Sequence, residues 1–103
     1  MAARGWGRVV SVALPCADPA EAEAHAGALS GATRAAARAA LGADVTVNAV
    51  FAGDADSGAN ALGRAVSAEE VAGVVAFLCS PLALTVTGES LAATGGASAA
   101  VSY

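Results

Sequence analysis

Two short valine-rich runs alternate with two longer segments of helical character along the chain. The first run, Gly7 to Leu14, is stopped by Pro15, and the second, Val45 to Phe51, has the β-branched content of a buried strand. Neither run alternates apolar and polar residues, as a strand with one solvent-exposed face would. The pattern therefore predicts two buried strands of a parallel sheet, and the second strand is expected to be central. A weaker third strand is predicted within Thr87 to Ala93.

Capping residues mark the expected starts of two helices. Asp18-Pro19-Ala20-Glu21 and Ser67-Ala68-Glu69-Glu70 both place a short polar side chain three residues before a glutamate. This arrangement satisfies free backbone N–H groups at a helix start. The sequence therefore predicts an alanine-rich helix that runs to about Leu41, before a glycine, and a second helix that stops at Pro81.

Alternation of strands and helices predicts one α/β domain over residues 1–103, a β-α-β-α-β unit with a small parallel sheet. We expect residues 1–5, 52–65 and 97–103 to be flexible, because their composition buries little surface. Right-handed crossovers that advance in one direction place both helices on the same face of the sheet. The other face would then be bare, which predicts that the long loop, the carboxyl-terminal tail or a partner chain covers it.

Charge and composition narrow the classes of function. The 103 residues carry a net charge of −4, contain no lysine, and spread five arginines along the chain without forming a basic stripe. Nucleic acid is therefore not an expected partner. No segment has the length and apolar character of a membrane span, and the apolar stretch near the start is too short for a secretory signal, so we expect a cytoplasmic protein. Cys16 and Cys79 are expected to be small buried hydrophobes rather than a disulfide or metal ligands.

A series of short motifs resembles the second half of the short-chain dehydrogenase/reductases, a family of nicotinamide-dependent oxidoreductases. The motifs occur in family order: Gly7 to Val12, Gly31-Ala32-Thr33-Arg34, Val45 to Val50, Glu69-Glu70-Val71-Ala72, Phe77-Leu78-Cys79-Ser80, Thr87-Gly88 and Gly95-Gly96. The resemblance implies a partial Rossmann-like fold.

The departures from this family concern its chemistry. The positions of the family's catalytic tyrosine and lysine fall at Ala22 and Ala26, and that of its serine falls near Leu14. A proton relay needs a titratable group within hydrogen-bond reach of the substrate, and none is present there. The amino-terminal half with its Gly-rich phosphate loop is also absent. The sequence therefore predicts no catalytic residue, no cofactor bound by this chain alone, and no independent enzyme.

Two residues after the second strand are candidates for a vestige of the cofactor site. The resemblance aligns Gly53 and Ser57 with a family motif that contacts the nicotinamide carboxamide, whereas the simpler interpretation is a turn at Gly53 in a solvated loop. His25 is interpreted as a surface side chain, although it is the sole imidazole. Asp54 and Asp56 lack the further ligands that a hard cation requires, so no metal site is predicted.

Two functions remain open from the sequence. The first is a non-catalytic half-domain that assembles into homo-oligomers or joins an active reductase subunit through the small residues of its first helix, which are Ala22, Ala26, Gly27, Ser30, Gly31, Ala35 and Ala39. The alternative is a subunit of an NAD(P)-dependent oxidoreductase that contributes loop atoms to a composite cofactor site. A small-molecule binding module, or a remnant without a present role, is a further possibility.

Overall fold

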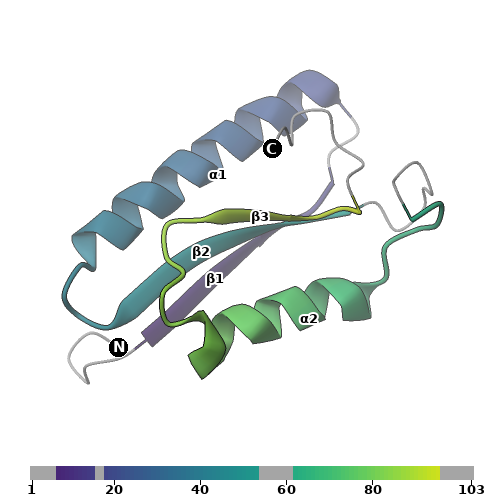
Figure 1. The fold of residues 1–103 in the computed structure, drawn as a ribbon. Helices are drawn as coiled ribbons and strands as arrows, with labels where there is room; N and C mark the ends of the chain where they lie inside the picture. Colours follow the sequence, from purple (N-terminus) through teal and green to yellow (C-terminus); the bar gives the residue numbers. More distant parts are fainter. Residues whose placement is uncertain (1–6, 16–17, 54–61, 96–103) are drawn as a thin grey trace.

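Three parallel strands form one sheet with β2 in its middle (Figure 1). The computed structural model describes residues 7–15, 18–53 and 62–95. Within them the elements follow in the order β1 (Gly7–Ala13), α1 (Pro19–Ala39), β2 (Val45–Ala52), α2 (Ala68–Cys79), the short 3₁₀ helix η2 (Pro81–Ala83) and β3 (Ser90–Ala93). The predicted α/β unit with a small parallel sheet is confirmed.

The segments expected to be flexible fall mostly outside these residues. Residues 1–5 and 97–103 are not described, and neither are residues 54–61 of the central segment. At the described ends of that segment, Ala52 closes β2 and residues 62–64 form a turn that leads toward α2.

β2 contributes the most buried part of the sheet, as predicted. Its residues 46–50 are all buried, and the register aligns Val50 with Val12 of β1 and Leu91 of β3. The prediction that β1 is buried on both faces is wrong. β1 is an edge strand that pairs with β2 alone within the described chain, and its Val12 is 46% exposed.

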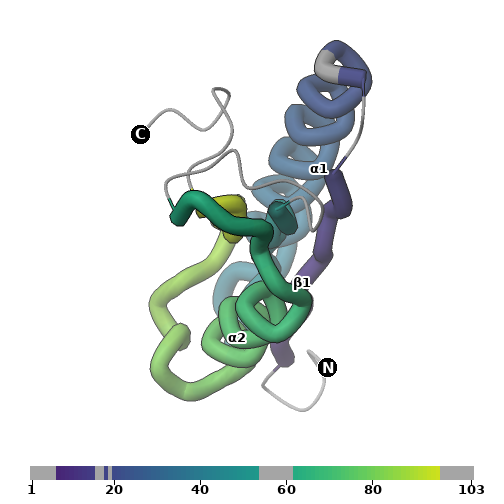
Figure 2. Tube along the Cα trace, turned by 90° about the vertical axis from the view of Figure 1, so that its right-hand side faces the viewer, coloured from purple at the N-terminus to yellow at the C-terminus, as the bar shows by residue number. Residues whose placement is uncertain are grey.

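The two helices lie on opposite faces of the sheet, so the prediction that they share a face is wrong (Figures 1 and 2). Both connections advance the same way, from β1 to β2 to β3. Helices on opposite faces therefore require crossovers of opposite hand, and the β2–α2–β3 connection is the left-handed one. The sequence rule failed because it assigns the common right-handed form to every crossover. The bare face it implied does not exist.

The layer between the sheet and α2 holds the main apolar core. Val50, Leu78 and Ala83 are fully buried there. Around them pack the partly buried side chains Val10, Val71, Val74, Val75, Val86, Leu91 and Ala93. Because side chains alternate along a strand, Val47 and Ala49 point to the other face, toward α1.

α1 approaches that second face through small side chains. Thr33 and Ala37 are its buried residues, and the hydroxyl of Ser30 shares a hydrogen bond of 2.9 Å with the hydroxyl of Ser90 on β3. A Cβ built on Gly88 would lie 3.5 Å from the Cβ of Ala37, an ordinary van der Waals contact. The alanine-rich composition thus serves close packing of α1 on the sheet.

Both helix starts are capped where the sequence predicted. The Asp18 carboxylate accepts a hydrogen bond of 2.9 Å from the Ala20 amide. Ser67 and Glu70 form a complete capping box, in which each side chain accepts from the other residue's backbone amide. No described helix combines the length and the apolar character needed to cross a bilayer.

Candidate functional site

The carboxyl ends of β2 and β3 form the edge where parallel α/β sheets commonly hold ligands. Gly53, just beyond β2, donates a hydrogen bond of 3.0 Å from its amide to the carbonyl of Ala93 at the end of β3. Its surroundings leave no room for a side chain, because a Cβ at Gly53 would lie 2.7 Å from Cγ2 of Val66 and 3.1 Å from the Ala93 oxygen. Gly53 therefore has a packing role at this edge, and its backbone φ is not in the left-handed region.

The second vestigial candidate, Ser57, lies outside the described residues, as do Asp54 and Asp56. At the same edge, Thr94 follows β3 and is buried, and its hydroxyl has no hydrogen-bond partner among the described residues. Thr94 was not predicted as a site residue from the sequence. The one sequence feature that could have indicated Thr94 is its position directly after the predicted third strand.

The face of α1 that aligns with the family's proton relay carries methyl groups. Ala22 and Ala26 lie one helical turn apart on the partly buried stripe that continues to Thr33 and Ala37. Leu14, near the expected serine position, is 78% exposed. His25 is exposed on α1, in agreement with its interpretation as a surface side chain. The three positions aligned with the family's catalytic residues, Ala22, Ala26 and Leu14, therefore supply no acidic or basic side chain.

Both helix N-termini already hold carboxylates. Asp18 and Glu21 occupy the start of α1, and Glu69 and Glu70 occupy the first turn of α2. A helix N-terminus attracts phosphate through its free N–H groups and its dipole, and a carboxylate there competes for both. Neither described helix N-terminus is therefore an open site for a phosphate group.

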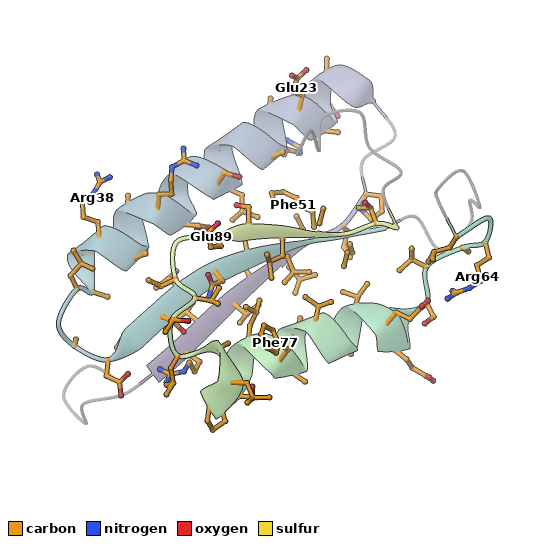
Figure 3. The ribbon with its side chains drawn as sticks, viewed as in Figure 1. Glu23, Arg38, Phe51, Arg64, Phe77 and Glu89 are labelled. Atoms are coloured by element: carbon orange, nitrogen blue, oxygen red, sulfur yellow. The ribbon has the colours of Figure 1, made fainter. Side chains whose placement is uncertain are left out.

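An ion pair fixes the approach to α2. Figure 3 labels Arg64 in the turn before α2. The two terminal guanidinium nitrogens of Arg64, Nη1 and Nη2, each donate to one oxygen of the Glu70 carboxylate at 2.7 Å. These bonds, and then the bond from the Ser67 amide, lower the pKa of Glu70 to about 2. The same hydrogen bonds raise the pKa of Arg64. Because Glu70 also closes the capping box, the pair joins the turn before α2 to the first turn of that helix.

Asn48 of β2 is a fully buried polar side chain for which the sequence predicted no individual role. Its amide nitrogen donates to the Val86 carbonyl at 3.0 Å, and its carbonyl oxygen accepts from the Glu89 amide at 3.1 Å. The Thr87 hydroxyl accepts in turn from the Val47 amide at 3.0 Å. Asn48 thus holds the segment before β3 against β2, which is a structural role.

The cysteines do not form a site. Cys79 is exposed at the end of α2 and has a free thiol, so the prediction that it is buried is wrong. Cys79 is the last residue of α2, at the end of the stripe formed by Val71, Val74, Val75 and Leu78. Cys16 lies outside the described residues. Within the described part of the chain, no three side chains of the metal-ligating types come together.

Comparison with known proteins finds one family model and several solved structures to which this chain is similar. The family model described as enoyl-(acyl carrier protein) reductase matches residues 54–98. No curated protein matches the chain. The solved structure of acetoin dehydrogenase YohF from Salmonella typhimurium is similar over 93% of this chain and 45% of its own, with 28% identity and a TM-score of 0.78.

Two structures of the TT0495 protein from Thermus thermophilus are similar over 94% of this chain. Both have a TM-score of 0.81, with identities of 30% and 32%, and the match covers 51% and 49% of those chains. The chain thus spans about half the length of the solved structures it matches.

Proposed function

Because the chain belongs to the short-chain dehydrogenase/reductase family and carries part of its fold, we propose that it is a non-catalytic half-domain that acts by association. It assembles into oligomers or joins an active reductase subunit. The observation that carries this proposal is apolar surface left open on a fold half the length of its structural relatives. Among the described residues, the exposed large hydrophobic side chains are Val12, Leu14, Leu41, Leu62, Phe77, Leu82 and Leu84.

Association of this chain does not require an uncovered sheet face. With one helix on each face, the surfaces available for association include the outer sides of α1 and α2 and the edges of the sheet (Figure 1). The lack of a tyrosine and a lysine at Ala22 and Ala26 supports the non-catalytic part of the proposal.

The small residues of α1 divide between two faces. Ala22, Ala26 and Ser30 are partly buried on the side of the sheet, whereas Gly27 and Gly31 have nothing within 4 Å of a built Cβ. The open side is the one on which a second helix would approach closely. A leucine at Gly31 meets open space in the single chain and blocks such an approach.

Light scattering at several protein concentrations tests association through α1. We expect the wild type to be larger than a monomer and Gly31→Leu to shift it toward the monomer without loss of fold, because leucine favours helix over glycine by about 1 kcal/mol. Gly73→Leu is the matched control, since Gly73 of α2 is equally open. The proposal is contradicted if the wild type is monomeric at every concentration and also fails to bind a reductase partner.

The alternative is a subunit that contributes to a composite nicotinamide site. The buried Thr94 hydroxyl beside Gly53 at the carboxyl edge of the sheet favours it. The acidic helix N-termini mean that the partner must supply the pyrophosphate contacts. A rise in melting temperature with NADPH that appears only in a complex with a reductase, and that is lost in Ser57→Ala or Thr94→Val, would support this function.

A further inference from the structure

We draw no further inference here: the strongest candidate, the surface patch of exposed apolar side chains around the junction of α2 and η2, formed by Phe77, Leu82 and Leu84, carries no proposal, because nothing in the described part of the structure shows what covers it.

Discussion

Gly53 and Val66 approach so closely that a Cβ on the glycine would lie 2.7 Å from Cγ2 of the valine. The contact joins the end of β2 to the buried residue that precedes the cap of α2. It explains a glycine that the resemblance had connected with a cofactor.

Gly53→Ala should destabilise the fold by about 1–3 kcal/mol, the usual cost of overpacking a tight site. Part of the clash is with the Ala93 carbonyl oxygen, which is backbone and cannot rotate away. Urea unfolding measures the loss. Gly31→Ala is the control and should leave stability unchanged or raise it by up to about 1 kcal/mol, because its surroundings are open and alanine favours helix. Equal stability of Gly53→Ala and wild type would contradict the packing role.

Asn48→Ala should cost about 1–3 kcal/mol, because it leaves the Val86 carbonyl and the Glu89 amide without their buried partner. Loss of the segment's anchor should also raise hydrogen exchange at Gly88, whose amide donates to the Val47 carbonyl at 2.7 Å. Ser90→Ala, which removes an exposed hydrogen bond to the Ser30 hydroxyl, should cost less than about 1 kcal/mol. A similar effect of both substitutions would show that Asn48 does not anchor the segment.

Acid should weaken the start of α2 through Glu70. Its pKa is about 2 in the fold against an ordinary value of 4.5. A carboxyl group with a lowered folded pKa stabilises the fold fully above the ordinary value, and this contribution is lost as the pH falls from about 4.5 to about 2.

Melting temperatures across this pH range test the assignment. Glu70→Gln should melt below the wild type at neutral pH, and the two curves should converge near pH 2. Added salt should narrow the difference because the pair is exposed. Glu69→Gln removes the same charge from the same turn without removing the contact to Arg64, so it should not reproduce this pH dependence. If it does, the net charge and not the ion pair is responsible.

Leu78→Ala should destabilise the fold by about 2–5 kcal/mol, because Leu78 is fully buried in the core under α2. Leu82→Ala removes the same atoms from a side chain that is 82% exposed and should change stability by less than about 0.5 kcal/mol. Denaturant midpoints of the two variants give the comparison. An effect of Leu82→Ala on association alone would place η2 in an interface.

Local features of the fold were predictable because their causes are local. Asp18 and Ser67 start helices where their side chains can cap them, and the valine content of β2 marked it as central. α1 ends at Ala39, just before the predicted Leu41, since the glycine that follows adopts a φ of +84° at position 42.

Features that depend on distant residues were not predictable. The side of the sheet that α2 occupies is set by packing of Leu78 against Val50, and a general rule for crossovers gave the wrong face. The need for glycine at position 53 comes from Val66 and Ala93, which no spacing in the sequence brings together. The partners of Asn48 lie about 40 residues ahead in the chain.

The placement of α1 and α2 on opposite faces fixes the thickness of the sheet layer but not its width (Figure 2). Nothing further can stack directly on the strands where a helix already lies, so growth of the sheet can proceed only sideways. Any larger assembly built on this sheet would gain strands at its edges and keep the three layers of helix, sheet and helix.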